Sequence, residues 1–216
     1  MSAHRRRAVG GSSDPEVMSF NAWSFRAIIE ILCLTLTCSV LGLAGESGDV
    51  FSFGLNHAVY LEPDTIGPGQ LGLGDNIDRY HPTKVPSLSG VIAVAAGAWH
   101  SLFLLENGCV YSCGKNSWGD LGLGDTEPRL IPTLIPGLSH VKAIAAGYDH
   151  NLVLLENGDV YSFGANQAGQ LGYSSSHPSP TPRKVPLPYP AIAIAAGAWH
   201  SLVTVSYTHL TLPTKA

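Results

Sequence analysis

The sequence predicts an all-β fold built from repeated four-stranded units, and three observations lead to that prediction. First, His100, His150 and His200 follow one another at intervals of 50 residues. Second, the residues around them recur: 93–114 (AVAAGAWHSLFLLENGCVYSCG) and 143–164 (AIAAGYDHNLVLLENGDVYSFG) match at 15 of 22 positions, and a third copy begins at residue 193. Third, each copy divides into short apolar runs separated by turn residues, which is typical of a β repeat architecture.

The second copy shows how one unit is built. The run AIAA before Gly147 predicts a short buried strand, HNLVLL predicts a second strand, and Asn157-Gly158 predicts a two-residue hairpin turn. Residues 159–163 alternate between polar and apolar side chains and predict a third strand. A glycine-rich loop (166–172) follows, and Lys184-Val185-Pro186 is expected to start a short fourth element. Four antiparallel strands in 50 residues are typical of one blade of a β-propeller.

One loop of the first copy is longer than its counterparts. Gly54 and Gly114 are 60 residues apart, whereas Gly114 and Gly164 are 50 apart, and the ten additional residues lie between Asn56 and Gly69. Growth of this kind is tolerated in a surface loop, because buried backbone would lose its hydrogen-bond partners. The insertion therefore supplies candidate partner-binding residues: Tyr60, Leu61, Glu62 and Asp64.

The repeated motifs Ala-Ala-Gly-x-x-His-Ser/Asn-Leu, Asn-Gly-x-Val-Tyr-Ser-x-Gly and Gln/Asp-Leu-Gly resemble the regulator of chromosome condensation repeat family, over residues 46–204. The resemblance implies a seven-bladed propeller, of which about three blades are present, so an incomplete fragment is expected. The founding member of the family exchanges nucleotide on the Ran GTPase and docks on chromatin. Other members are domains of ubiquitin ligases, light receptors and secreted inhibitors, so the fold does not determine the function. Light receptors carry Trp directly after the repeat Gly; Ala98, Tyr148 and Ala198 stand there and disfavour photoreception.

Most repeated positions are explained by backbone structure without a ligand. Glycine permits turns and close approaches that a side chain forbids. Equivalent histidines are spread around a propeller axis, one per blade, so the sequence predicts that each imidazole bonds neighbouring backbone instead of sharing a zinc ion. Trp99 and Trp199 share one repeat position, and either partner binding or blade-to-blade packing accounts for them. The predicted structural positions are Gly54, Gly97, His100, Gly108, Gly114, Gly147, His150, Gly158, Gly164, Gly197 and His200.

The sequence contains no catalytic or cofactor-binding pattern that stands apart from the repeat. The stretches 71–75 and 121–125 (LGLGD) lack the Lys-Ser/Thr of a phosphate-binding loop, and no Ser/His/Asp or Cys/His set is evident. Residues 46–204 hold 13 acidic residues against seven Lys or Arg, a net charge of −6 with neutral histidines. This balance argues against a large nucleic-acid-binding face. No enzyme activity, cofactor or metal is expected.

The two ends depart from the repeat. Residues 1–45 form an atypical segment whose apolar run, 31–43, is too short for a membrane span; it is either signal-like or the product of an incorrect gene model. Residues 205–216 resemble a translated sequencing adapter and are expected to be a non-biological tail. Cys109 and Cys113 lie four residues apart on one predicted strand, about 13 Å from each other, so they cannot form a disulfide and free thiols are expected.

Three functions remain open at this stage. The first is a non-catalytic scaffold that binds a protein partner through its blade loops. The second is a guanine-nucleotide exchange factor for a small GTPase, and the third is a targeting module of a larger enzyme such as a ubiquitin ligase; both rest on the family resemblance. A cytoplasmic or nuclear location is expected, or the secretory pathway if residues 1–44 are a signal peptide. The isolated fragment is expected to self-associate, because an open ring leaves apolar blade faces and strand edges unpaired.

Overall fold

The computed structural model describes residues 48–57 and 68–206, and this part of the chain consists of β-strands, turns and loops. No helix capable of crossing a membrane occurs among these residues. The predictions made for residues 1–47, for Tyr60, Leu61, Glu62 and Asp64, and for 207–216 lie outside the described residues. The strands are β1 (Phe51–Gly54), β2 (Arg79–Lys84), β3 (Val91–Ala96), β4 (His100–Leu105), β5 (Val110–Gly114), β6 (Arg129–Leu134), β7 (Val141–Ala146), β8 (His150–Leu155), β9 (Val160–Gly164), β10 (Ser179–Lys184), β11 (Ala191–Ala196) and β12 (Ser201–Val205).

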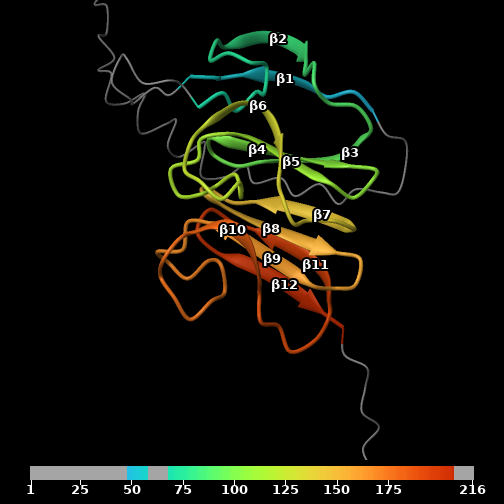
Figure 1. Ribbon diagram of the computed structural model, residues 1–216, viewed down its shortest axis with the longest axis vertical. Coiled ribbons are helices and arrows are strands. Elements are labelled where there is room, and N and C mark those ends of the chain that lie inside the picture. The colour runs from blue at the N-terminus through green and yellow to red at the C-terminus, as the bar shows by residue number, and fades with distance from the viewer. Residues whose placement is uncertain (1–47, 58–67, 207–216) are drawn as a thin grey trace, which may run out of the picture. The chain divides into compact units, whose positions relative to one another are not determined.

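The strands form antiparallel sheets in chain order (Figure 1). Two sheets have four strands, β3-β4-β5-β6 and β7-β8-β9-β10, and each is a complete propeller blade. The pairs β1-β2 and β11-β12 provide the last two and the first two strands of a blade, respectively. The predicted all-β fold with about three blades is therefore confirmed. Val205 ends β12 opposite Ala191, one residue beyond the boundary predicted for the repeats.

The Asn-Gly pairs lie in hairpin turns as predicted, but not as two-residue turns: Glu156 and Asn157 are the central residues of the turn after β8, and Gly158 follows them. Gly158 joins β8 to β9 with a φ of 84°, and its N–H donates to the carbonyl of Leu155 at 3.0 Å. The Asn157 side chain accepts a hydrogen bond from the N–H of Asp159 at 2.9 Å. A positive φ costs glycine nothing, so the turn is compatible with the strands on both sides. Gly108 makes the same turn between β4 and β5, with a φ of 75°.

The fourth strand was predicted in the wrong place. The sequence places its start at Lys184, but β10 begins at Ser179 and ends at Lys184. Pro180 and Pro182 disguise it, because proline cannot donate to a sheet ladder and normally argues against a strand. β10 is the edge of its sheet, and its pairing with β9 shifts register between Ser179 and Arg183. Both prolines fall within this irregular stretch of an edge strand, where the missing N–H groups are tolerated.

Successive residues of one strand pack against opposite neighbouring sheets, because side chains alternate between the two faces of a strand. Leu102 and Leu104 of β4 lie in one buried cluster with Val153 and Phe163 of the following blade. Phe103, between the two leucines, belongs to another cluster together with residues that precede β3. The core is thus divided into layers between successive sheets, as expected for a propeller.

The outermost sheets leave apolar side chains exposed. Phe53 of β1 is 63% exposed, whereas Phe163, at the equivalent position of β9, is fully buried against the preceding blade. Leu202 of β12 is 62% exposed, whereas the equivalent Leu152 is buried. The expectation of self-association depends on these two apolar faces.

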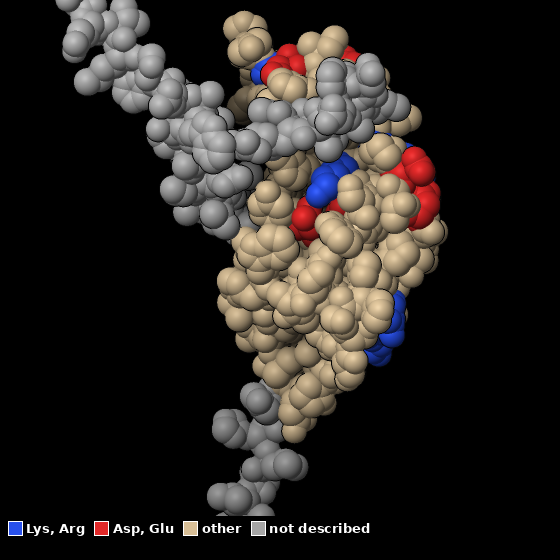
Figure 2. Space-filling view, turned by 90° about the vertical axis from the view of Figure 1, so that its left-hand side faces the viewer, with Lys and Arg blue, Asp and Glu red and all other residues tan. Residues whose placement is uncertain are grey.

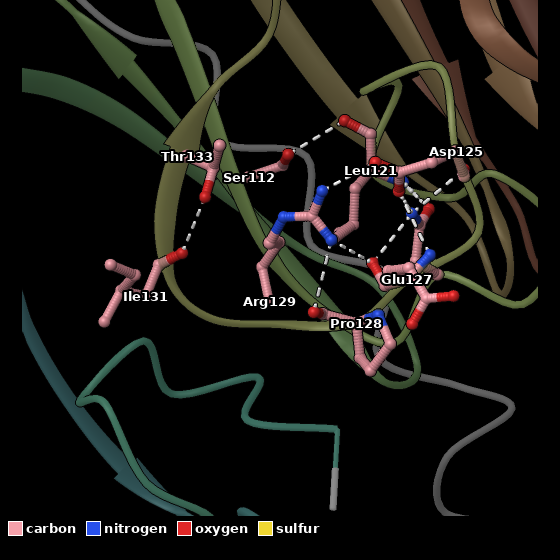
Figure 3. Close-up of polar contacts among 9 residues, drawn as sticks. Ser112, Leu121, Asp125, Glu127, Pro128, Arg129, Ile131 and Thr133 are labelled. Carbon is pink, nitrogen blue, oxygen red and sulfur yellow. Dashed lines mark hydrogen bonds and ion pairs between the residues drawn. The ribbon is translucent and has the colours of Figure 1, made fainter. Parts of the chain in front are cut away.

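The loop that follows each third strand is closed by an asparagine. Asn116 is buried; its Nδ2 donates to Asp125 Oδ1 at 2.9 Å, and its Oδ1 accepts the N–H of Leu121 at 2.9 Å. Arg129 binds Asp125 at 2.6 Å and donates to the carbonyl of Glu127 at 2.8 Å (Figure 3). Asn56, Asp75 and Arg79 repeat this arrangement in the first copy. Asp75 and Asp125, the last residues of the two LGLGD stretches, therefore help to hold this loop.

The free cysteines agree with the sequence. Cys109 and Cys113 are both free. Cys113 is fully buried, and burial raises the pKa of its thiol to about 12, so it stays protonated. It acts as a small core residue.

Candidate partner-binding surface

The Gly-x-x-His turns are tight because the histidine ring folds back over the glycine. In the turn from β7 to β8, the N–H of Gly147 donates to the carbonyl of His150 at 2.8 Å. A Cβ on Gly147 would lie 2.2 Å from Cε1 of His150, closer than any side chain allows. A Cβ added at Gly97 or at Gly197 would likewise lie 2.2 Å from Cε1 of His100 or His200, respectively. Glycine is therefore required at these positions by close approach and not by an unusual φ.

Successive turns lie side by side at one end of the blades. The N–H of Ala98 donates to the carbonyl of Tyr148 at 3.2 Å, and the N–H of Tyr148 donates to the carbonyl of Ala198 at 3.1 Å. The loop after β5 lies at the same end, because Lys115 N–H donates to the carbonyl of Trp99 at 2.8 Å. We call this end, formed by the Gly-x-x-His turns and the loops after β1, β5 and β9, the turn face.

Just beneath the turn face, hydrogen bonds join the β3–β6 blade to the β7–β10 blade; we call this contact the first junction. Nε2 of His100 lies 2.8 Å from Oδ1 of Asn151, the residue after His150 in the next blade. Nδ2 of Asn151 donates to the carbonyl of Asp120 at 2.7 Å. Since the amide oxygen can only accept, Nε2 of His100 carries the proton.

The contact between the β7–β10 blade and β11–β12, which we call the second junction, has the same pattern with other residue types. Nε2 of His150 lies 3.1 Å from Oγ of Ser201, and that hydroxyl donates to the carbonyl of Gln170 at 2.7 Å. The sequence-based prediction of backbone partners for these imidazoles was thus wrong: in both junctions Nε2 meets a side chain of the next blade. Spacing within one repeat cannot reveal a partner that lies across the junction.

Both histidines are held neutral. Burial lowers the pKa of His100, against the hydrogen bond to Asn151. Burial lowers the pKa of His150 to about 4, with smaller contributions from His100 and His200. Among the described residues, no group of three or more His, Cys, Asp or Glu side chains is arranged to hold a metal ion. The geometry accounts for the imidazoles as donors between blades.

The residue before each histidine gives the turn face its surface chemistry. Trp199 is 47% exposed and stacks on Tyr148, with ring centroids 5.3 Å apart and planes 15° apart. Trp199 therefore packs against the neighbouring blade and presents an aromatic surface at the same time. Trp99 is half-buried. Asp149, between the two tryptophans in the repeat, is buried and forms an ion pair with Lys115 at 3.1 Å.

A second carboxyl group lies near this ion pair. Asp120 is fully buried, and its Oδ1 has no hydrogen-bond partner among the described residues. Burial, with the nearby charge of Asp149, raises the pKa of Asp120 to about 7, while Lys115 acts in the opposite direction. The equivalent residues in the other copies are Gln70 and Gln170. The first junction alone thus contains a titratable group at this position.

The structure locates the base of the predicted binding loop. Gly69 N–H donates to the carbonyl of Asn56 at 3.4 Å, so the two ends of the insertion meet. They do so in the loop after β1, which belongs to the turn face. In the next copy, Ser117 and Trp118 occupy the place of the insertion, and Trp118 is 43% exposed. The two residues that flank the insertion, the tryptophans and the ion pair therefore lie at one end of the blades.

Sequence reasoning missed Lys115, Trp118 and Tyr148 as members of this surface. An exposed tryptophan at the position that carries the insertion in another copy was a usable signal for Trp118. Lys115 and Tyr148 could not be found in this way, because their importance comes from contacts with residues of another blade.

Charged side chains are few among the described residues. Figure 2 shows small, separate clusters of Lys or Arg and of Asp or Glu on the face in view, without a continuous basic surface. Several of the cations are paired with carboxylates, including Arg79, Arg129 and Lys115. Aromatic groups and the Lys115–Asp149 ion pair, in which only the aspartate is buried, therefore distinguish the turn face.

Comparison with known sequences identifies the repeat. A family model described as the regulator of chromosome condensation (RCC1) repeat matches residues 67–104, 107–154 and 157–204. The match 107–154 contains β5 and β6 of one blade and β7 and β8 of the next. Each repeat consequently spans a junction, so both ends of the Asp120–Asn151 contact lie within one repeat.

Individual relatives match over shorter stretches. The RCC1 domain-containing protein RUG3, mitochondrial, of Arabidopsis thaliana is 46% identical over 52 residues, and the regulator of chromosome condensation of Mus musculus is 44% identical over 52 residues. These alignments cover 23% and 24% of this chain and 12% of each relative. The chain thus matches about an eighth of the length of these curated relatives.

Solved structures share the fold. Prp20p of Saccharomyces cerevisiae, described with its binding properties to Gsp1p and histones, superposes with a TM-score of 0.62 at 22% identity, over 74% of this chain and 40% of Prp20p. The structure of Kap60 bound to yeast RCC1 (Prp20) gives a TM-score of 0.60 at 30% identity, over 72% of this chain and 36% of that one.

Proposed function

The chain belongs to the regulator of chromosome condensation repeat family, and on that premise we propose that its blades are a non-catalytic scaffold that binds a protein partner through the turn face. The exposed Trp199, stacked on Tyr148, is the observation that carries the proposal. Tryptophan and tyrosine are enriched among the residues that dominate protein–protein binding energy. The stack holds the Trp199 ring in place before binding, which reduces the entropy that a partner must overcome.

The surroundings of the stack favour a protein over a small molecule or nucleic acid. A half-exposed aromatic surface beside a partly exposed ion pair suits a protein interface, in which aromatic residues are enriched and polar groups surround them. The separate clusters of charge in Figure 2 offer no extended surface for phosphates. We place this activity in the cytoplasm or nucleus; the matched relatives lend no support to the secretory alternative.

The proposal is tested by affinity capture with the full chain from cell extract, with bound proteins measured by mass spectrometry. Trp199→Ala should reduce recovery of the direct partner at least tenfold. Tyr189→Ala is the matched control, because Tyr189 is 46% exposed and lies at the opposite end of the blade, between β10 and β11. A protein set that is unchanged by Trp199→Ala, or reduced equally by both variants, would refute the role of the turn face.

Guanine-nucleotide exchange on a small GTPase is a second candidate, supported by the similarity to Prp20p and by the location of the insertion. Exchange requires a structure that opens the nucleotide site, and the residues that flank the insertion, Asn56 and Gly69, lie in the turn face. We expect the full chain to accelerate nucleotide release from one member of a panel of purified small GTPases, and deletion of residues 58–67 to abolish the effect. Absence of acceleration across the panel removes this candidate. A targeting role within a larger enzyme would leave the Trp199 prediction unchanged.

A further inference from the structure

We propose that Thr181 is a phosphorylation site for a proline-directed protein kinase, a role separate from the turn face. The sequence Thr181-Pro182-Arg183-Lys184 places a proline directly after the hydroxyl residue and two cations behind it. Among all 216 residues, Ser or Thr is followed by Pro only at Ser179 and Thr181. The two sites lie on the same strand and differ in accessibility, so they provide a comparison within one molecule.

The backbone around Thr181 is extended, with the carbonyls of Pro180 and Thr181 accepting hydrogen bonds from Gly124 N–H at 2.9 Å and Ser179 Oγ at 2.8 Å. β10 is an edge strand, and its register with β9 shifts between Ser179 and Arg183, so Thr181 has no partner in the ladder. Pro180 and Pro182 on either side have no N–H to donate. A kinase needs the substrate hydroxyl within about 3–3.5 Å of the transferring phosphorus, and an extended edge segment reaches such a site with little rearrangement.

The Thr181 hydroxyl is available for reaction. The residue is exposed, and its Oγ1 makes no hydrogen bond within the described part of the chain. Its methyl group faces the neighbouring blade, 3.7 Å from where a Cβ of Gly124 would lie. Since Oγ1 occupies the other branch of Cβ, it is not the atom in that contact. Thr83 and Thr133 differ, because their hydroxyls donate to the carbonyls of His81 and Ile131 at 3.1 Å.

Ser179 shows what makes Thr181 distinct. Ser179 also precedes a proline, but it is 3% exposed and its Oγ donates to the carbonyl of Thr181 at 2.8 Å. In the other blades, the position of Thr181 is occupied by His81 and Ile131, each followed by the repeated proline. The proline is therefore a feature of every repeat, whereas a hydroxyl residue directly before it at this position occurs only at Thr181.

The cations after the proline complete the recognition sequence. Arg183 and Lys184 are both exposed, and the Lys184 side chain is 57% exposed while paired with Asp159 at 2.8 Å. Arg183 lies over the ring of Tyr173, with its guanidinium carbon 4.5 Å from the centroid. Exposed ion pairs and cation–π contacts are weak, so acidic groups of a kinase can compete for these side chains.

The reaction is an ordinary phosphoryl transfer from ATP. Thr181 Oγ1 attacks the γ-phosphorus, the bond from that phosphorus to the β,γ-bridging oxygen breaks, ADP leaves, and the hydroxyl proton passes to the base of the kinase. The product carries about −1.5 to −2 charge. Arg183, two residues further along the strand, is exposed and can bind the phosphate, which would draw it away from Tyr173.

The test uses the folded full chain, Mg-ATP and a purified proline-directed kinase, with intact-mass and fragment-mass analysis. We expect one phosphate, on Thr181, and none on Ser179. Thr181→Val should abolish incorporation, and Pro182→Ala should reduce the initial rate at least tenfold. Circular dichroism compares the folding of each variant with that of the parent chain.

A peptide of residues 174–188 serves as the accessibility control. Phosphorylation of Thr181 in both peptide and folded chain, with Ser179 modified only in the peptide or not at all, supports the proposal. Modification of Thr181 in the peptide but not in the folded chain would overturn it, because the strand would then hide the hydroxyl. Failure in both would overturn the sequence recognition, and equal labelling of Ser179 and Thr181 in the folded chain would overturn the claim of selectivity.

Discussion

The two junctions between blades make the same connection with different chemistry. In the first, His100 meets Asn151, which donates to the carbonyl of Asp120; in the second, His150 meets Ser201, which donates to the carbonyl of Gln170. An amide and a hydroxyl are interchangeable here because each both accepts from Nε2 and donates to a backbone carbonyl. The repeat therefore requires a hydrogen-bonding role, and it leaves the residue type free.

The difference between the junctions lies in charge. The first contains Asp120 and the Lys115–Asp149 ion pair, whereas the second has Gln170, Ala165 and Trp199 at these positions. A buried carboxyl group beside another carboxylate is costly when ionised. The stability of the first junction therefore depends on pH through a carboxyl group, whereas that of the second does not, although the two have the same strand arrangement.

Exchanging residues 120 and 170 tests that conclusion most strongly. The pKa of Asp120 is about 7 in the folded chain and 3.8 in its ordinary state, so stability is lost as pH rises from about 4 to 7. Three pKa units correspond to about 4 kcal/mol. We expect Asp120→Gln to raise the free energy of unfolding by up to about this amount at pH 8, with the gain vanishing near pH 4, as measured by urea denaturation.

Gln170→Asp is the reciprocal variant. It should transfer the loss of stability between pH 4 and 7 to the second junction, since residue 170 is also buried. A stability difference between Asp120→Gln and the parent chain that does not change with pH would contradict the assignment of the carboxyl group as the source.

Acid should act on both junctions through their histidines. The folded pKa of His150 is about 4, below its ordinary 6.5, so its contribution is complete above pH 6.5 and is lost as pH falls towards 4. This change of 2.5 units amounts to about 3 kcal/mol. His150→Gln keeps a donor at the position of Nε2 and cannot titrate, so its stability relative to the parent chain should improve as pH falls through this range.

His200→Gln is the matched control for that measurement. His200 is exposed and has no following blade among the described residues, so its replacement should change the pH profile much less than His150→Gln does, through its small contributions to the pKa of His150. If both substitutions altered the profile equally, burial at the junction would not be the cause of acid sensitivity.

The sequence predicted the elements of each blade well because their signals are local. Asn157-Gly158 indicates a turn by its own conformational preference, and residues 159–163 alternate between polar and apolar side chains as a strand does. β10 was misplaced because Pro180 and Pro182 mask a strand that survives only at an edge. The partners of His100 and His150 escaped prediction for a different reason: they are set by how one blade is rotated on the next, which no spacing within a repeat records.

Residues of the turn face could also be predicted from the sequence only where their signals are local. Trp199 was recognisable from the sequence as either a packing or a binding residue, and the stack on Tyr148 makes it a packed residue with an exposed face. Asp120 looked like an ordinary variation of Gln70 and Gln170. Its significance appears only with Lys115 of its own loop and Asp149 of the next blade near it.

Removing Lys115 should have the smallest effect and separates two roles of the ion pair. Lys115 is partly exposed, with 30% of its side chain accessible, so solvent already screens its attraction for Asp149. Lys115→Met keeps much of the apolar stem and should lower the free energy of unfolding by about 1–2 kcal/mol at pH 8. A double-mutant cycle with Asp149→Asn measures the pair itself.

The decisive readout is the pH at which stability changes. Lys115 lowers the pKa of Asp120, and Asp149 raises it. Lys115→Met should therefore move the midpoint of the Asp120-dependent loss to higher pH, and Asp149→Asn should move it to lower pH. Opposite shifts would show that the ion pair sets the titration of the first junction, whereas a loss of stability without any shift would mean that Lys115 contributes through packing alone.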